Sequence, residues 1–222
     1  ELPDCQWRVL LPDAARGARL RVIGAGKAAA SLARGVEAVL AARIDDGLVI
    51  VKHGHAESLR VCRQLEAGHP LPDEASARAA AAVFDFVGRP RAGDGFIVLL
   101  TGGASALLAS PAAGLTLEDK VAVTRQLVAS GATIAEINVV RRHLSRIKGG
   151  QLARALAPAA SVTLAISDVL GDEPTAIGSG PTVPDPSSFA DALAVLGRLG
   201  LEASIPPRAL RHLRTGAAGG VE

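Results

Sequence analysis

Residues 19–42 read RLRVIGAGKAAASLARGVEAVLAA, and this stretch indicates the fold class. The apolar run over 19–23 is typical of a short buried strand, and it leads into the glycine turn Gly24-Ala25-Gly26. The alanine-rich residues from Lys27 to about Ala42 carry their larger apolar side chains at helical spacing. A strand, a tight turn and a helix in this order form the repeating unit of an α/β protein.

Three further apolar runs predict buried strands, over residues 47–51, 96–100 and 161–167. Between and after them, helices are expected over about 73–87, 116–130, 134–147 and 188–199, and residues 52–72 are expected to form a loop. Short apolar strands that alternate with helices favour a parallel sheet covered on both faces. We therefore predict an α/β fold, a three-layer α/β/α Rossmann-like sandwich with a mostly parallel sheet.

Helix boundaries carry local signals of their own. Asp73 is a plausible N-cap, because its carboxylate can accept the free N–H groups of the first turn. Thr116 with Asp119 resembles a capping box, and Gly131 stands where a helix-terminating glycine belongs.

Composition excludes several classes of function. Aromatic residues make up 2% of the 222 residues and the net charge is +2 with no basic stripe, which argues against nucleic-acid binding. No apolar run is long enough to span a membrane, and the start at Glu1 lacks the features of a secretion signal, so we expect a cytoplasmic protein. Cys5 and Cys62 have no CxxC spacing, so neither a disulfide nor a transition-metal site is expected.

The predicted strands end in unusual sequence, and ligands of such folds bind beyond the carboxyl ends of the strands. These ends are Gly24-Ala25-Gly26-Lys27, Thr101-Gly102-Gly103-Ala104-Ser105, and Ser167-Asp168 with Asp172 close behind. Glycines let backbone N–H groups approach a phosphate at the start of a helix, and Lys27 adds a full charge. Each glycine pair alone could simply make a turn, but three such ends on one sheet edge favour an anion-binding cleft.

The first loop admits two interpretations. Gly24, Gly26 and Ala29 fit the dinucleotide fingerprint G-x-G-x-x-G/A, yet the second strand is followed by Lys52 and His53 rather than by an acidic residue. Lys52 could bind the extra phosphate of NADP, so the first loop is also compatible with a reductase. The loop is not a Walker A motif, because the spacing and the following Ser or Thr are missing.

Two polar groups add candidate site residues. Asn138, Arg141 or Arg142, and Ser145 share one face of the helix from Ile134; spacing alone favours a solvated face, and a cationic wall for a carboxylate or phosphate is the alternative. Asp168, Asp172 and Glu173 follow a buried strand, where carboxylates could bind magnesium and orient a hydroxyl, or could serve turns and caps instead.

Several longer segments together resemble one family. They are GAGKAA at 24–29, GHP at 68–70 with Pro72-Asp73, LLTGGASALL at 99–108, NVVRRHLSRIKGG at 138–150 and ISDVLGDEPTAIGSGPTVPDP at 166–186. In this order they resemble the class II glycerate 2-kinases, the MOFRL-type family, over nearly the whole chain. The resemblance implies an ATP- and magnesium-dependent kinase that converts D-glycerate to 2-phosphoglycerate, in a cleft between a Rossmann-like N-terminal domain and a smaller C-terminal domain.

The resemblance also implies roles for individual residues. Lys27 and Asp168 would be catalytic, and Gly102, Gly103 and Ser105 would line the phosphate side of the cleft, together with the Gly24 and Gly26 turn. Arg141, His143 and Lys148 would face the substrate, and Asp168 with Asp172 would bind the metal.

Two departures from the family pattern accompany the resemblance. Ala104 replaces the third glycine of the usual Gly-Gly-Gly-Ser loop, which is tolerable if its φ is negative. The chain ends at Glu222, before the family's C-terminal domain, so we expect an N-terminal domain over 1–203, a tail over 204–222 and little or no turnover from this chain alone. The alternatives are an NADP-linked hydroxypyruvate reductase and a catalytically silent nucleotide-binding module. The oligomeric state stays open, with a homodimer as one arrangement.

Overall fold

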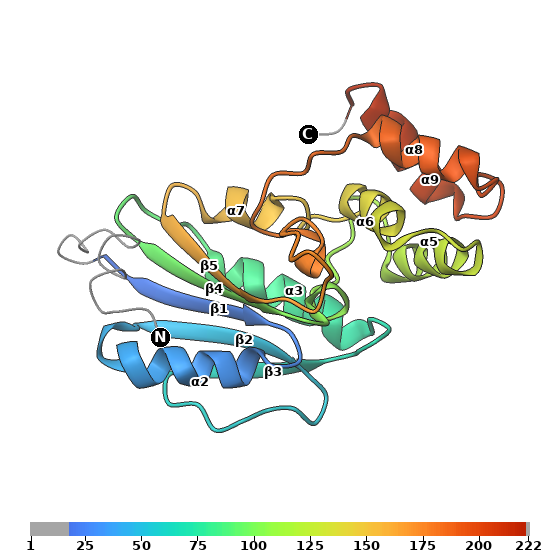
Figure 1. The fold of residues 1–222 in the computed structure, drawn as a ribbon. Helices are drawn as coiled ribbons and strands as arrows, with labels where there is room; N and C mark the ends of the chain where they lie inside the picture. Colours follow the sequence, from blue (N-terminus) through green and yellow to red (C-terminus); the bar gives the residue numbers. More distant parts are fainter. Residues whose placement is uncertain (1–17, 221–222) are drawn as a thin grey trace.

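The computed structural model describes residues 18–220, so Cys5 and the segment beginning at Glu1 lie outside the described residues. Its centre is a five-stranded sheet in which every strand pair is parallel, in the order β3-β2-β1-β4-β5 (Figure 1). The strands are β1 (Leu20–Ala25), β2 (Asp46–Lys52), β3 (Cys62–Ala67), β4 (Gly95–Thr101) and β5 (Ala160–Ile166). Strands β2 and β3 are added on one side of β1, and β4 and β5 are then added on its other side. The carboxyl ends of the neighbours β1 and β4 therefore form the topological switch point.

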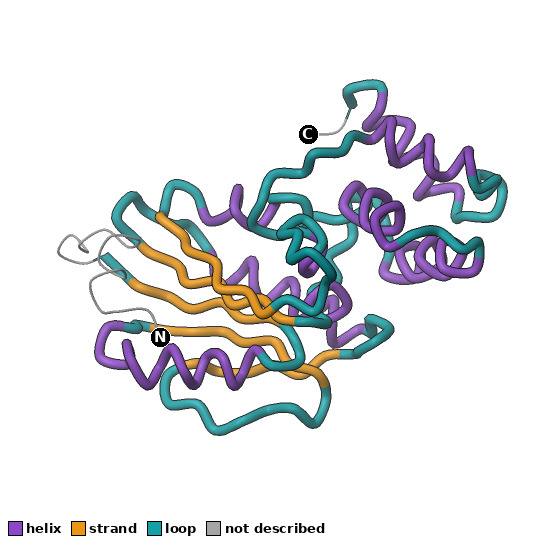
Figure 2. Tube along the Cα trace, in the orientation of Figure 1, coloured by secondary structure: helices purple, strands orange, loops and turns teal. Residues whose placement is uncertain are grey.

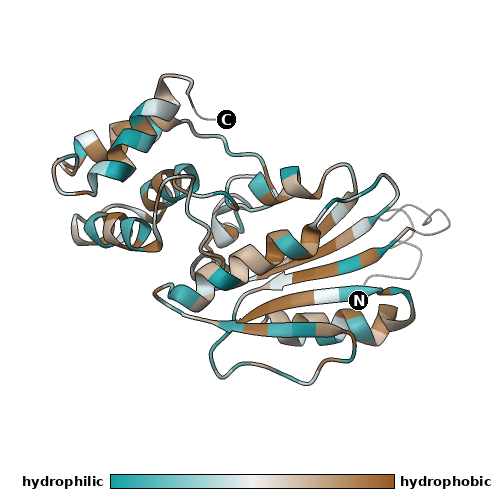
Figure 3. Cartoon of the chain, turned by 180° about the vertical axis from the view of Figure 1, so that it is seen from behind, coloured by the Kyte–Doolittle hydropathy of each residue, from teal (hydrophilic) through white to brown (hydrophobic). Residues whose placement is uncertain are grey.

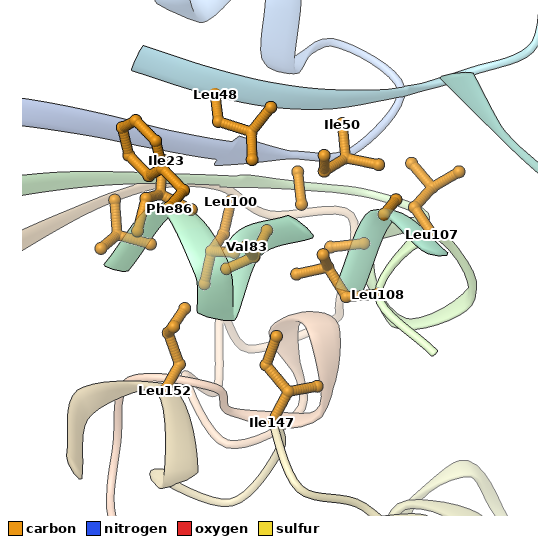
Figure 4. Close-up of a cluster of buried hydrophobic side chains, with 14 of the residues drawn as sticks. Ile23, Leu48, Ile50, Val83, Phe86, Leu100, Leu107, Leu108, Ile147 and Leu152 are labelled. Atoms are coloured by element: carbon orange, nitrogen blue, oxygen red, sulfur yellow. The ribbon is translucent and has the colours of Figure 1, made fainter. Parts of the chain in front are cut away.

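Alternating side chains of the strands build two apolar layers, one on each face of the sheet. Ile23, Leu48 and Leu100 point to the face that is covered by α3 (Glu74–Val87), α4 (Ala104–Leu107) and α7 (Gln151–Leu156) (Figure 4). Val22 and Val49 point to the opposite face, against α2 (Ala29–Leu40). The predicted three-layer α/β/α sandwich is therefore confirmed, and the sheet is entirely parallel rather than mostly so.

A third apolar core lies beside the sheet rather than on it. It joins α5 (Leu117–Ala129), α6 (Ile134–His143), α8 (Phe189–Arg198) and α9 (Pro207–Ala217), which gather at one end of the molecule in Figure 1. These helices carry both apolar and polar residues, whereas the central strands are mostly apolar, as Figure 3 shows. The helix at 207–217 belongs to this core, although those residues were expected to be a tail; a domain boundary at residue 203 stays a prediction.

Several elements differ from expectation. Strand β3 lies within the predicted loop 52–72; its sequence CRQLEA has no continuous apolar run, because an edge strand faces solvent. Helix α6 ends at His143 rather than near 147, because Ser145 instead forms a β-bridge with Pro111 and donates its hydroxyl to Ser110 O at 3.1 Å. Four short elements were not predicted: the helices α4 and α7 and the 3-10 turns η1 (Ala41–Arg43) and η2 (Ile177–Ser179).

The predicted caps are confirmed. Asp73 caps α3 and Thr116 caps α5, each in a reciprocal capping box, and Gly131 follows α5 with φ +74°. The loop from 171 to 186, drawn as a tube in Figure 2, then leads across the molecule to α8. Within residues 18–220, no helix has the length and apolar character that a membrane span requires.

Candidate active site

The first two glycine loops interlock at the switch point. The backbone N–H of Lys27 donates to Gly102 O at 2.9 Å, and the N–H of Ala28 donates to the Thr101 hydroxyl at 3.1 Å. Gly26 adopts φ +138°, and a Cβ at this position would lie 2.0 Å from Thr101 Oγ1. Only glycine permits this approach, so the turn after β1 is positioned directly against the end of β4.

Three side chains from distant parts of the sequence converge on the second loop. A Cβ on Gly102 would lie 2.2 Å from Asp168 Oδ2, and a Cβ on Gly103 would lie 2.8 Å from His69 Cδ2 and 3.3 Å from Lys27 Cγ. Gly103 also has φ +91°, a conformation that favours glycine. We call these five residues the Gly102–Gly103 cluster: Lys27, His69, Gly102, Gly103 and Asp168. Lys27 and Asp168 therefore share one edge of the sheet.

The charges of the Gly102–Gly103 cluster are available to a ligand. Lys27 and Asp168 are exposed, and neither side chain has a hydrogen-bond or ion-pair partner within residues 18–220. His69 is half-buried, and burial, followed by the neighbouring Lys27 and Lys52, lowers the pKa of its imidazole below the ordinary value. The ring is therefore neutral near pH 7 and can accept as well as donate a hydrogen bond.

A polar network supports the second loop from behind. Lys148 is 2% exposed, and its ammonium group donates to Ser105 O at 2.9 Å and to Ser105 Oγ at 3.0 Å. Ser105 Oγ in turn lies 3.1 Å from Ser179 Oγ, and Ser179 donates to Asn138 Oδ1 at 2.9 Å. Ser179 holds φ +63°, which is strained for a residue with a side chain, so the surrounding contacts must impose this conformation.

Arg141 lies on the far side of this network. Its side chain lines a small cavity together with Lys120, Lys148 and Ser105. Two of the three expected substrate residues, Arg141 and Lys148, thus lie together, immediately behind the loop that carries Gly103.

Three expected site residues lie apart from the Gly102–Gly103 cluster. Gly24 is buried inside β1, where a Cβ would lie 3.0 Å from Val49 Cγ1, so it packs the sheet instead of lining the edge. His143 faces a different cavity of about 710 Å³, and its ring contacts Phe189 at 4.6 Å between centroids. Asp172 is exposed, has φ +53° and borders a third cavity along β5 with Ser167.

The solvated interpretation of the α6 face is wrong. Asn138, Arg142 and Ser145 are buried, and Arg142 Nε forms an ion pair with Asp185 Oδ1 at 2.8 Å. Spacing alone could not reveal this, because the loop around Asp185 is distant in sequence and covers the polar side of the helix. Ala104 begins α4 and has a negative φ, so the methyl group that replaces the family's third glycine is accommodated.

His69 belongs to the Gly102–Gly103 cluster, although it was not among the expected site residues. The segment GHP at 68–70 follows β3 directly, so His69 stands at the carboxyl end of a parallel strand. Because β3 was not predicted, the rule that ligands bind at strand carboxyl ends was never applied to His69. Ser179 was missed as well, and no local pattern marks it.

Comparisons with known proteins agree on one family. A family model described as "Domain of unknown function (DUF4147)" matches residues 6–214. A protein of Agrobacterium vitis that carries the name "Putative hydroxypyruvate reductase" is 49% identical over 200 residues, which cover 90% of this chain and 45% of that protein. The glycerate 2-kinase of Pyrococcus horikoshii is 41% identical over 204 residues, covering 92% of this chain and 46% of the kinase.

A solved structure has the same fold. The crystal structure of glycerate kinase from Thermotoga maritima superimposes with a TM-score of 0.83 at 40% identity, covering 88% of this chain and 47% of that one. The chain thus spans about half the length of the curated relatives it matches.

Proposed function

Since the chain belongs to the DUF4147 family, the N-terminal domain of the glycerate 2-kinases, we propose that it binds the nucleotide and the hydroxy acid in a kinase that phosphorylates D-glycerate. The reaction moves the γ-phosphate of ATP to a hydroxyl of D-glycerate and yields 2-phosphoglycerate and ADP. The choice of the 2-hydroxyl rests on the family resemblance.

The convergence of Lys27 and Asp168 on Gly102 and Gly103 is the observation that carries this proposal. Phosphoryl transfer depends mainly on positioning and on charge stabilisation. In the proposal Lys27 stabilises negative charge on the transferring phosphoryl group, and the Gly26 and Gly102–Gly103 backbone admits the phosphates closely. Neutral His69, beside Lys27, is placed to accept the proton of the attacking hydroxyl or to hold the phosphate by a hydrogen bond.

Asp168 is the residue that would hold magnesium, because its exposed carboxylate has no partner within residues 18–220. No group of three or more His, Cys, Asp or Glu side chains in the described part of the chain is arranged to bind a metal together. This suits magnesium, which typically takes one or two carboxylates and completes its shell with phosphate oxygens and water. When bound, the ion would offset the charge of those oxygens. Asp172 lies apart from the Gly102–Gly103 cluster, so Asp168 is the carboxylate that we propose as the ligand.

The test is an assay of the product of the complete gene that contains these residues, supplied with D-glycerate and MgATP. We expect 2-phosphoglycerate and ADP in equal amounts, and Lys27→Ala should lower the rate at least about 100-fold. Arg43→Ala is the matched control, since Arg43 is an exposed cation in η1, the 3-10 turn that follows α2. For the 222-residue chain alone we expect little or no turnover. ATP binding without ADP formation by the complete product would instead support a silent nucleotide-binding module.

A second candidate function is NADP-linked reduction of hydroxypyruvate. It is favoured by the name of the Agrobacterium vitis relative and by the spacing of Gly24, Gly26 and Ala29. Against it, Gly24 is buried within β1 and no carboxylate follows directly after β2 for a ribose hydroxyl. Loss of reduced-nicotinamide absorbance on addition of hydroxypyruvate would support the reductase, and no change together with ADP formation would exclude it.

A further inference from the structure

A small cavity behind the second glycine loop is lined by positive charge. It lies between α5, α6 and residues 70–72, has a volume of about 40 Å³, and we call it the cationic pocket. Its charged lining residues are Lys120, Arg141 and Lys148, with Ser105 at the side nearest Gly103. None of the lining residues is an aspartate or a glutamate.

The three cations of the cationic pocket have no acidic partner. Lys120 Nζ donates to Leu144 O at 2.9 Å, and Lys148 Nζ donates to the carbonyl and hydroxyl oxygens of Ser105, so both lysines contact only neutral acceptors. The guanidinium of Arg141 has no hydrogen-bond or ion-pair partner within residues 18–220. A charge removed from water without a counter-charge is costly, and three adjacent cations increase the cost.

Two buried arginines elsewhere in the described residues do have carboxylate neighbours. Arg142, the next residue along α6, pairs with Asp185 at 2.8 Å, and Arg21 lies 3.9 Å from Asp94 beneath the sheet. Among the buried basic side chains of residues 18–220, those without a carboxylate neighbour are therefore the ones that line the cationic pocket. A missing counter-charge at a cavity beside the candidate active site is what a bound anion would supply.

We propose that the cationic pocket binds the carboxylate of the hydroxy acid, with Arg141 as the bidentate donor and Lys120 and Lys148 as flanking charges. A planar carboxylate matches the two parallel N–H groups of a guanidinium. The volume corresponds to roughly three water molecules, which suits a carboxylate and excludes a nucleotide. The identity of the acid rests on the proposed function, whereas the charge of the ligand rests on the pocket.

The position of the pocket fits this assignment. Ser105 lies two residues after Gly103, and Pro70 follows His69, so the pocket and the Gly102–Gly103 cluster share the same two segments of chain. A small acid held by its carboxylate there would therefore lie beside the loop that carries Gly102 and Gly103. Of the residues expected to face substrate, the proposal assigns Arg141 and Lys148 to the carboxylate, and it adds Lys120.

Proton uptake is a consequence that can be measured. Burial, then the nearby Arg141, lowers the pKa of Lys120 to about 7, and burial lowers the pKa of Lys148 well below its ordinary value, with Arg141 and Lys120 adding to the effect. The charged groups that face Lys120 are Arg141, Lys148 and, from α9, His212. An anion favours the charged form of each lysine, so its binding above pH 7 should take up protons.

Calorimetric titration of D-glycerate into the 222-residue chain tests the proposal without ATP or magnesium. Titrations at pH 8 in buffers of different ionisation enthalpy give both the affinity and the number of protons bound. We expect uptake of roughly half a proton or more per glycerate. Lys120→Met should reduce this uptake, with Lys148 left to take up the remainder, and Arg141→Met should weaken binding at least about 10-fold. Arg125→Met, at an exposed arginine of α5, should change neither the proton uptake nor the affinity for D-glycerate.

Titrations with other small molecules identify the chemical group that the pocket binds. Glycerol, which has the hydroxyls but no carboxylate, should not bind. Inorganic phosphate that binds more tightly than D-glycerate in a Lys120-dependent manner would overturn the carboxylate assignment. Glycerate binding that neither Lys120→Met nor Arg141→Met weakens would overturn the pocket, as would a lack of glycerate binding by both this chain and the complete gene product.

The outcomes separate this inference from the proposed function. If the complete gene product phosphorylates D-glycerate while Lys120→Met and Arg141→Met leave KM unchanged, the kinase stands and the pocket is wrong. If glycerate binds with proton uptake but no phosphate is transferred, the pocket stands and the kinase is wrong.

Discussion

Gly102 lies so close to Asp168 that the missing side chain is part of the site. The backbone of Gly102 has no unusual φ, so its importance comes from space and not from conformation. The carboxylate of Asp168 occupies the place where a Cβ would be, beside the carbonyl that accepts the N–H of Lys27. A methyl group there would move the carboxylate away from the Gly102–Gly103 cluster.

We predict that Gly102→Ala lowers phosphoryl transfer by the complete gene product at least about 10-fold, because misplacement of a reacting group by an ångström is costly. The fold should survive, since the exposed Asp168 side chain can rotate. Gly35→Ala is the matched control: nothing lies within 4 Å of its Cβ on α2, so it should stabilise by about 0.5–1 kcal/mol and leave the rate unchanged. Full activity in Gly102→Ala would contradict the position given to Asp168.

The edge strand β3 depends on a contact from a helix. Glu37 of α2 is 1% exposed and accepts hydrogen bonds from the backbone N–H groups of Arg60, Val61 and Cys62 at 2.7, 3.0 and 2.8 Å. Burial alone would raise the pKa of Glu37, but these bonds outweigh it and the pKa is lowered. The carboxylate thereby fixes where β3 begins, and β3 in turn leads to His69.

We predict that Glu37→Gln lowers the free energy of unfolding by about 1–3 kcal/mol at pH 7, because an amide cannot replace the carboxylate at three donors. The folded-state pKa lies below the unfolded one, so the contribution is fully present above about pH 4.5 and is lost as the pH falls through the folded value. Urea unfolding at pH 7 and at pH 3 measures this, and the difference between wild type and variant should shrink in acid. Exposed Glu74→Gln is the control; an equal loss at both pH values would contradict the mechanism.

Three apolar cores hold the chain together, two on the sheet and one among the peripheral helices. Helix α9 contributes Ala209 and Leu213, both fully buried, to the third core. The same core contains Val140 of α6, three residues before His143 and next to Arg141. Packing of α9 therefore bears on the geometry of the cationic pocket, even though α9 lines no part of it.

We predict that Leu213→Ala lowers the free energy of unfolding by about 2–4 kcal/mol within a single transition. Exposed Arg211→Ala, two residues before Leu213 on the same helix, should change it by less than about 0.5 kcal/mol. Denaturant unfolding followed by circular dichroism measures both. If residues 204–222 are a loosely attached tail, Leu213→Ala will leave the main transition unchanged, and the boundary at residue 203 will then be supported.

Local sequence pattern was enough to predict the strand-turn-helix order, the glycine loops and the caps at Asp73 and Thr116. It also indicated the candidates Lys27 and Asp168. The spacing of apolar residues, cap chemistry and turn glycines all act over a few residues. The edge strand β3 could not, because a strand with one paired side and an exposed face needs no apolar run. Contacts between segments far apart in sequence decide the rest of the site. They bury Asn138 and Arg142 and place His143 at a different cavity from Arg141. They also bring Lys120, Arg141 and Lys148 together around one cavity. Their positions follow from how α5, α6 and the loop to α8 pack together. Such packing joins segments that are distant in sequence, so local sequence pattern does not predict it.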